Sequence, residues 1–407
     1  MPTRIASDRY TSIDYPRMRE YRLGRTRKMM EKYGVDTLIT FEAWDVRYIT
    51  GSYVPPAVKW PEGCFVVLTK NGDPHLFTFS VPALEKELTW MKPGHIHWQM
   101  GITKLLFTPE AWEPYMVEIE KIIKAEGVED GVIGIDGSSN ELILCQALEN
   151  HGFKKYIDAK EMMFDARKIK NEDDIECVRE ACAIAEAAFY EIQKAIRPGV
   201  SECELMGIGM KKLYELGMDE TMEFVVASGP RTNPIRIDCT DRLIRPGDLV
   251  FVDINGASFQ GYKTCYYRTF CCGKATEEQK ACFREARDMM YAGMAQIKAG
   301  NTTRDICEQW PDSPTYWGYD ADDWNGVAPH AVGHGIGLSL HEFPLFSRPG
   351  MGGAAVLEEG MTLAVETWAG KKGGDFGVRV EECVVVRKDG YELLTKYPID
   401  ELIECPF

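Results

Sequence analysis

The segment from His330 to Glu342, HAVGHGIGLSLHE, holds three of the chain's 7 histidines and an alternating series of glycines. Glycine lets a backbone turn sharply and approach a ligand closely, so we expect His334 to lie on a loop or a short strand. His334 and His341 are too far apart in the sequence to share one helical turn. A lone buried histidine is usually a satisfied core residue, but this clustering favours a functional site.

Three carboxylates lie inside segments that otherwise have the pattern of apolar β-strands. These are Asp253 in LVFVDIN, Glu366 in MTLAVETWAG and Glu381 in GVRVEECVVV. A buried carboxylate is costly unless it is paired or bound to a metal. Any one of the three strands could be an edge strand whose acid faces water. Three such strands in the same half of the chain as the histidines indicate a shared site, with Asn255 on the same strand face as Asp253.

The composition narrows the class of partner. The chain has 47 Lys and Arg against 63 Asp and Glu, a net charge of −16, which argues against nucleic acid or an anionic membrane surface. A small-molecule substrate fits better. The first residues lack the apolar core of a signal peptide, no apolar run of membrane-spanning length occurs, and the 13 cysteines form no CxxC pair. We therefore expect a cytoplasmic protein with reduced thiols.

The first part of the chain alternates helical and strand patterns. An amphipathic helix is predicted from Tyr15 to Tyr33, and KNGD at 70–73 predicts a hairpin between two β-rich runs. A short buried strand, GVIGID at 131–136, follows two further helical stretches. This alternation predicts an α/β domain with a mixed sheet.

The chain is expected to change domain near residues 159–172, which gives domains 1–160 and 161–407. A long amphipathic helix from Asp173 to Ile196 follows. Residues 308–326, rich in Trp, Tyr and acids, form an irregular insertion before the histidine cluster. The insertion is either a surface loop with aromatic anchors or a wall of the pocket or of a dimer contact.

Several motifs together resemble the creatinase, prolidase and methionine aminopeptidase family. They are VDING, GYKTCYYRTF, GHGIG followed by LHE, the strand after EEGM, and GVRVEE. The resemblance implies an α/β (α+β) fold, with an N-terminal creatinase-like domain and a C-terminal pita-bread domain built on a curved antiparallel sheet. It also implies a homodimer in which a loop such as Gly51 to Trp60 caps the partner's site. SGPRTNP at 228–234 is similar to the dimethylsulfoniopropionate lyases of this fold.

The resemblance implies a metal site with one changed ligand. Metal-dependent members bind two ions through two Asp, one His and two Glu, and four of these positions match: Asp253, His334, Glu366 and Glu381. Cys265 stands where peptidases carry the bridging Asp, and Asn255 stands where the lyase relatives carry a further acid. Three outcomes remain. Cys265 acts as a thiolate ligand, which favours zinc or iron; or a single divalent transition metal (Zn, Fe or Mn) binds through Asp253, His334 and the two Glu; or the site is metal-free as in creatinase.

The segment that carries a histidine in peptidases and creatinase holds Arg231 and Arg236 here. Arginine offers a fixed fork for a substrate carboxylate and cannot act as a base at neutral pH. A surface ion pair with Asp238 or Asp241 is the alternative, less expected for Arg231. The other candidates for substrate contact are His330, Asn255, Arg379 and Trp60.

These observations predict an enzyme that hydrolyses a carbon–nitrogen bond in a small carboxylate-bearing substrate. His341 and either Glu366 or Glu381 would handle protons, and peptidase activity would be weak or absent. One alternative is a lyase in which a carboxylate such as Asp253 abstracts a proton. Another is a non-catalytic binding protein, against which the retained site residues speak.

Overall fold

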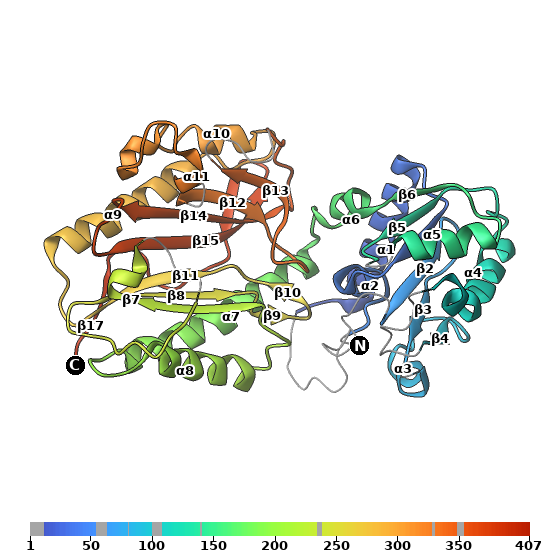
Figure 1. Cartoon of the computed structure of the whole chain (residues 1–407), viewed down its shortest axis with the longest axis horizontal. Helices are drawn as coiled ribbons and strands as arrows, with labels where there is room; N and C mark the ends of the chain where they lie inside the picture. Colours follow the sequence, from blue (N-terminus) through green and yellow to red (C-terminus); the bar gives the residue numbers. More distant parts are fainter. Residues whose placement is uncertain are drawn as a thin grey trace. The chain divides into compact units, whose positions relative to one another are not determined.

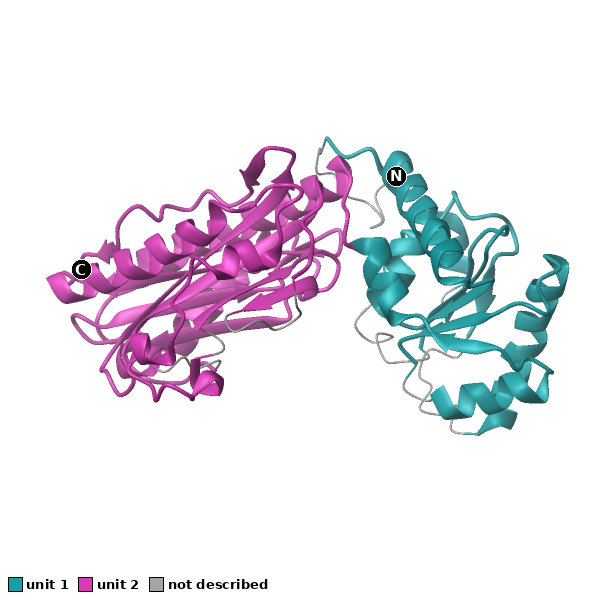
Figure 2. Ribbon diagram, turned by 90° about the horizontal axis from the view of Figure 1, so that it is seen from above, with its two compact units in different colours: residues 1–167 teal, residues 168–407 magenta. Residues whose placement is uncertain are grey.

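The computed structural model of the chain forms two compact units, residues 1–167 and 168–407 (Figure 2). It describes residues 12–53, 63–79, 81–99, 108–138, 141–233, 238–327, 330–347 and 354–407, so Trp60 and Arg236 lie outside the described residues. Unit 1 ends beyond the boundary expected at residue 160, because the helix that ends at Arg167 packs on the first helix of the chain. Arg167 also forms a buried ion pair with Asp45.

Unit 1 is built on one six-stranded mixed sheet, as the sequence predicts. Its order is β4-β3-β2-β1-β5-β6, with antiparallel pairs β1–β2 and β2–β3 and parallel pairs β1–β5, β3–β4 and β5–β6. The strands are β1 Thr37–Thr40, β2 Phe65–Thr69, β3 His75–Thr78, β4 Ile96–Trp98, β5 Ile133–Asp136 and β6 Tyr156–Asp158. The helices are α1 Tyr15–Tyr33, α2 Ala43–Thr50, α3 Val81–Glu87, η2 Pro109–Trp112, α4 Glu113–Ala125, α5 Glu141–Asn150 and α6 Lys160–Arg167.

Local sequence signals set the ends of these elements. The Asp14 carboxylate accepts a hydrogen bond from the Arg17 amide at 3.0 Å and caps α1, which ends at Gly34 with φ 70°. The predicted hairpin joins β2 to β3. Both predictions, the helix and the hairpin, are confirmed.

Unit 2 has two large sheets between layers of helices (Figure 1), and β9 and β10 form a separate two-stranded sheet. The strands are β7 Glu223–Ser228, β8 Leu249–Asn255, β9 Ser258–Phe259, β10 Tyr262–Lys263, β11 Tyr267–Cys272, β12 Ala331–Gly335, β13 Glu342–Ser347, β14 Thr362–Gly370, β15 Gly377–Arg387, β16 Gly390–Leu393 and β17 Ile403–Cys405. The helices are α7 Glu172–Ala195, α8 Glu202–Glu215, η3 Gly229–Thr232, α9 Glu277–Met294, α10 Thr303–Cys307, η4 Pro314–Trp317 and α11 Trp324–Val327.

The two sheets have the orders β17-β11-β8-β7 and β13-β12-β14-β15-β16, and they meet where β11 packs on β15. Helices α7 and α8 cover the first sheet, and α9 packs on β14 and β15 of the second (Figure 1). The strands are antiparallel except where β17 joins β11 in parallel. The antiparallel sheet expected for the second domain is thus present, and its strands are divided between these two adjoining sheets. Among the described residues, no helix combines the length and the apolar character needed to cross a bilayer.

A buried arginine links the two sheets. Arg268 on β11 pairs with Glu382 on β15 at 3.0 Å, and both side chains are 1% exposed. Its guanidinium also donates to the carbonyl oxygens of Tyr397, at 2.9 Å, and of Glu381. Removing one member of a buried ion pair leaves an uncompensated charge, so this pair should control the stability of unit 2.

We expect Arg268→Met to lower the free energy of unfolding of unit 2 by about 3–5 kcal/mol, because Glu382 would stay buried without its cation. Urea unfolding of the full chain followed by far-UV circular dichroism measures this change. Lys211→Met is the control, because Lys211 is 78% exposed in its pair with Glu215, and an exposed pair contributes at most about 1 kcal/mol. Equal effects of the two substitutions would contradict the role given to Arg268.

Candidate functional site

Glu366 and Glu381 face each other on neighbouring strands. Glu366 on β14 is the direct cross-strand partner of Glu381 on β15, and both are buried. Two like charges in opposite positions destabilise a sheet, so the pair needs a cation or a proton. The structure thus brings together two carboxylates that lie 15 positions apart in the sequence, and their role in a site stays a prediction.

Arg379 neutralises one of these carboxylates. It lies two residues before Glu381 on β15, forms an ion pair with Glu366, and donates through Nε to the Tyr267 hydroxyl at 3.1 Å. Burial raises the pKa of Glu366, and the Arg379 guanidinium counteracts part of that rise. The sequence offered Arg379 as a substrate contact, but in the structure its guanidinium is already engaged by Glu366.

Asn255 connects Asp253 to Cys265. Its amide nitrogen donates to the Asp253 carboxylate at 2.9 Å, and its amide oxygen accepts from the Cys265 thiol at 2.9 Å. Burial, followed by the nearby Glu381, raises the pKa of Cys265 well above its usual range. Asn255 therefore orients two side chains of the site, whereas the sequence suggested that it contacts substrate.

His334 presents one free ring nitrogen. Nδ1 donates to the Gly335 carbonyl oxygen at 2.9 Å, which fixes the tautomer and leaves Nε2 with a lone pair. Nε2 is buried and has no partner in the described part of the chain. Burial, with a smaller effect of His341, lowers the pKa of His334 to about 3, so the ring is neutral at neutral pH. The predicted short strand is β12.

Three donors converge at this point. Cys265, His334 and Glu381 each offer one ligand atom, and these atoms all lie within 4.8 Å of one another. Both Glu381 oxygens and His334 Nε2 lack partners among the described residues. A thiol, an imidazole and a carboxylate with uncompensated lone pairs form a donor set that fits one divalent transition metal, with zinc best suited to mixed S, N and O ligands.

The remaining two positions of the implied ligand set do not belong to this group. Asp253 and Glu366 are buried nearby, but Glu366 is engaged by Arg379 and one Asp253 oxygen by Asn255. The other Asp253 oxygen, Oδ1, is without a partner in the described structure. Burial, together with the adjacent Glu366, raises the pKa of Asp253 well above its usual range.

His330 lies in an aromatic enclosure. Its ring is 4.3 Å from that of Trp368, 5.5 Å from Trp317 and 5.6 Å from Tyr319, between ring centroids. The side chain is 5% exposed, and neither nitrogen has a hydrogen-bond partner among the described residues. Burial lowers the pKa of His330 to about 4, so it is a neutral group available for a ligand contact.

Part of this aromatic enclosure comes from the insertion at 308–326. Trp317 and Tyr319 belong to the insertion, and Trp317 Nε1 donates to the Trp368 carbonyl oxygen at 3.0 Å. The insertion therefore packs against the strands of the site, one of the roles left open by the sequence. The sequence did not assign these aromatic residues, although the density of Trp and Tyr in the insertion was the available signal.

His341 lies next to the metal-ligand candidate His334, whereas Arg231 is held by carboxylates outside the group of Cys265, His334 and Glu381. The His341 ring lies 4.4 Å from the His334 ring, between centroids, and its side chain is exposed. Arg231 is held by two carboxylates, Asp238 at 2.8 Å and Glu202 at 3.3 Å. The sequence favoured Arg231 as a free contact for a substrate carboxylate over an ion pair with Asp238, and this preference was wrong. The fold also places the buried carboxylate of Glu202 next to the Arg231 guanidinium.

Comparisons with known proteins agree with this architecture. The model of metallopeptidase family M24 matches residues 176–388. The model of the creatinase/prolidase N-terminal domain matches residues 22–169. The chain is 26% identical over 382 residues to the Xaa-Pro dipeptidase of Pyrococcus horikoshii, covering 91% of this chain and 95% of that protein. It is 24% identical over 433 residues to the dimethylsulfoniopropionate lyase DddP of Roseovarius nubinhibens, and the match covers 98% of this chain and 91% of the lyase.

The structure of an Xaa-Pro dipeptidase from Bacillus anthracis superimposes with a TM-score of 0.75 at 26% identity, over 95% of this chain and 99% of that one. The creatinase-like and pita-bread domains expected from the sequence are thus confirmed. The family model matches more than half of the 407 residues and includes every donor of the site. The chain belongs to metallopeptidase family M24.

Proposed function

We propose that this protein hydrolyses a carbon–nitrogen bond in a small carboxylate-bearing substrate, with one divalent transition metal held by Cys265, His334 and Glu381. The observation that carries the proposal is the convergence of their three ligand atoms within 4.8 Å, with His334 Nε2 and both Glu381 oxygens unpartnered. Uncompensated buried lone pairs are costly, so the arrangement is stable when a cation accepts them.

A metal bound there would supply Lewis-acid chemistry by polarising the carbonyl oxygen or the water of hydrolysis. The chain's own residues would manage protons and orientation. Although the His341 side chain is exposed, partial desolvation of its ring lowers the pKa, so the neutral ring can accept a proton beside the metal ligands and return it to a leaving amine. His330 would contact the substrate through a neutral nitrogen, while Arg379 holds Glu366 in an ion pair.

Peptidase activity is expected to be weak because the dinuclear arrangement is incomplete. In two-metal hydrolases a bridging carboxylate helps to hold the ions about 3.5–4 Å apart. Cys265 has one donor atom, so it cannot bridge two ions through two separate atoms as a carboxylate does. Glu366 is already paired with Arg379, which further reduces the number of free carboxylates.

A lyase reaction is the second candidate, and Asp253 is the observation that favours it. Its unpartnered Oδ1 and its raised pKa suit a carboxylate that takes a proton from carbon. The lyase relative covers 98% of this chain. Proton NMR of reactions with onium carboxylates separates the candidates, because elimination produces an alkene and hydrolysis does not. A binding homologue would turn over neither substrate class.

We also propose a homodimer, as the resemblance to creatinases and prolidases implies, and a reducing compartment such as the cytoplasm, where the 13 thiols would stay free.

We expect about one transition metal per chain when the protein is purified without added metal, because Cys265, His334 and Glu381 form one donor group. Elemental analysis by mass spectrometry measures it. Cys265→Ala should weaken binding roughly tenfold or more, whereas Cys282→Ala, a buried thiol of α9 outside the group, should not. Two equivalents of metal per chain would show that a dinuclear site forms.

We expect turnover of Xaa-Pro and Met-Xaa peptides to be weak with manganese, cobalt or zinc, and to rise in Cys265→Asp by roughly tenfold or more, because a bridging carboxylate is restored. Initial rates with each metal are the measurement, and Cys282→Asn serves as a variant of a thiol outside the site. A wild type that equals an ordinary peptidase, with the variant no better, would refute this interpretation of Cys265.

We expect light scattering at micromolar concentration to give twice the chain mass of 46.0 kDa. In the implied arrangement, the smaller domain of each chain covers the site of the other, so activity and mass should fall together on dilution. A species of 46.0 kDa that retains full activity would rule out a shared site.

A further inference from the structure

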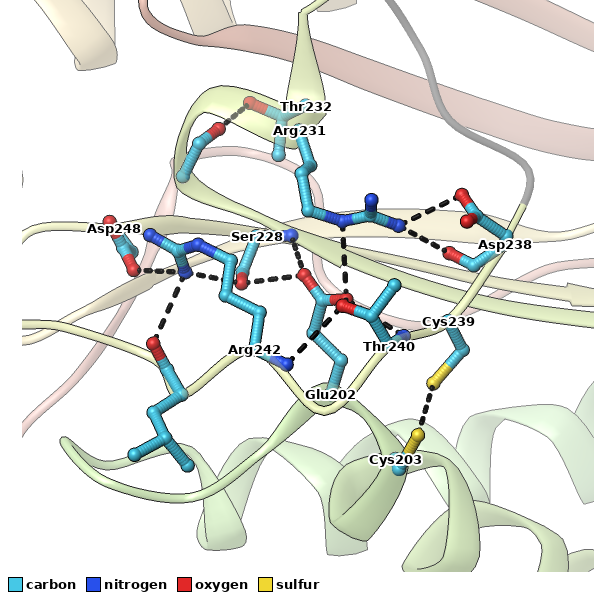
Figure 3. A network of polar contacts seen from close by, with 12 residues as sticks. Glu202, Cys203, Ser228, Arg231, Thr232, Asp238, Cys239, Thr240, Arg242 and Asp248 are labelled. Atoms are coloured by element: carbon cyan, nitrogen blue, oxygen red, sulfur yellow. Dashed lines mark hydrogen bonds and ion pairs between the residues drawn. The ribbon is translucent and has the colours of Figure 1, made fainter.

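Two cysteines meet at the surface of unit 2, outside the site described above (Figure 3). Cys203 lies in the first turn of α8, and Cys239 lies in the segment after η3. Their sulfur atoms are 3.5 Å apart, with the Cys239 thiol donating to Cys203. All 13 cysteines of the chain lie among the described residues, and Cys203 is the only exposed one.

Backbone hydrogen bonds hold the two segments together. The Cys203 amide donates to the Thr240 carbonyl oxygen at 3.0 Å, and the Glu202 amide donates to the Arg242 carbonyl oxygen at 3.1 Å. The segment from Thr240 to Arg242 is therefore fixed against the beginning of α8. The two thiols are therefore close because the backbone segments that carry them are hydrogen-bonded to each other.

A buried carboxylate strengthens the same contact. Glu202 is 0% exposed and accepts hydrogen bonds from the Thr240 amide and hydroxyl, at 3.0 and 2.6 Å. Its other oxygen accepts from the Ser228 amide and hydroxyl, each at 2.8 Å (Figure 3). This carboxylate thus joins α8, the end of β7 and the residue after Cys239.

The residue before Cys239 is also fixed. Arg231 donates to the Asp238 carboxylate at 2.8 Å and to its carbonyl oxygen at 3.1 Å (Figure 3). Because Asp238 and Thr240 are both held, Cys239 has little freedom to move away from Cys203. A thiol pair that is fixed in this way has a high effective concentration for reaction with itself.

We propose that Cys203 and Cys239 are a redox modification site, at which a peroxide forms a reversible disulfide within one chain. The Cys203 sulfur attacks a peroxide oxygen and breaks the O–O bond, giving a sulfenic acid and one water. The Cys239 sulfur, after losing its proton, attacks the Cys203 sulfur and expels hydroxide, which leaves as the second water. The two thiols lose two electrons and two protons in total, and the peroxide takes them up as it becomes two waters.

The roles of the two sulfurs follow from their surroundings. Cys203 faces solvent and accepts the hydrogen bond, so it meets the oxidant first. Burial, followed by the hydrogen bond to Cys203, raises the pKa of Cys239 to about 12, which suits a resolving thiol that stays protonated until the sulfenic acid forms. A disulfide of about 2.05 Å requires the sulfurs to approach by roughly 1.5 Å.

The other thiols are poorly placed for this reaction. Cys182 and Cys383 both contact the Thr264 hydroxyl, at 3.5 and 3.6 Å, but both are 0% exposed. An aqueous peroxide would reach Cys203 before them. The new bond would close a covalent loop that contains β7, the edge strand of its sheet, and would tie that strand to α8.

The experiment treats the reduced full-length protein with a small excess of hydrogen peroxide, blocks the remaining thiols with N-ethylmaleimide, and maps tryptic peptides by mass spectrometry. We expect a linked pair of peptides containing Cys203 and Cys239, about 2 Da lighter than the sum of the free peptides, and complete reversal by dithiothreitol. Cys239→Ser should instead retain a Cys203 sulfenic acid that dimedone traps.

Cys145→Ser, which changes a partly buried thiol of unit 1, is the matched control and should form the same link as the wild type. The proposal is overturned if Cys203 and Cys239 remain unlinked while other thiols are consumed, or if dimedone traps no Cys203 sulfenic acid in Cys239→Ser. A link through Cys203 between two chains, seen as a dimer on a non-reducing gel, would also overturn it. None of these outcomes depends on the metal site or on the substrate.

Discussion

The cost of keeping carboxylates inside the apolar sheets of unit 2 is the constraint on which its functional site depends. Asp253, Glu366 and Glu381 are all buried, and each would destabilise the fold as an isolated charge. Glu366 is compensated by Arg379, and Glu382 on the same strand as Glu381 is compensated by Arg268. Glu381 has no such partner among the described residues, and burial raises its pKa well above the usual range, so it needs either a proton or a cation.

The different compensation of the two facing glutamates divides the site into two parts. Around Glu381 the structure gathers an unpartnered imidazole nitrogen and a thiol, which is a metal-binding donor set. Around Glu366 it places a guanidinium and the Tyr267 hydroxyl, which form a closed polar network without a metal. This difference is the basis for proposing one ion in the first part, whereas the second part already holds a fixed arginine.

The aromatic insertion adds a further layer to the site. The rings of Trp317 and Tyr319 contact His330, which directly precedes β12, the strand that carries His334. A neutral imidazole surrounded by rings is a directional polar group in an otherwise apolar wall.

The sequence by itself determined the local features. The first helix, the hairpin at 70–73 and the long helix of unit 2 follow from periodicity, turn chemistry and caps, all of which involve neighbouring residues. The positions of Glu366 and Glu381 in apolar segments were sufficient to indicate a buried site. The family motifs identified the fold, because their order and spacing are visible in the chain alone.

Only the tertiary structure decided which partner each polar side chain has. Arg231 meets Glu202, Arg379 meets Glu366, and the aromatic insertion meets His330, through contacts between different helices, strands and loops. These pairings depend on strand register and on side-chain direction, neither of which local pattern specifies. For the same reason the sequence could propose Cys265 as a ligand, but only the fold could bring its sulfur beside His334 and Glu381.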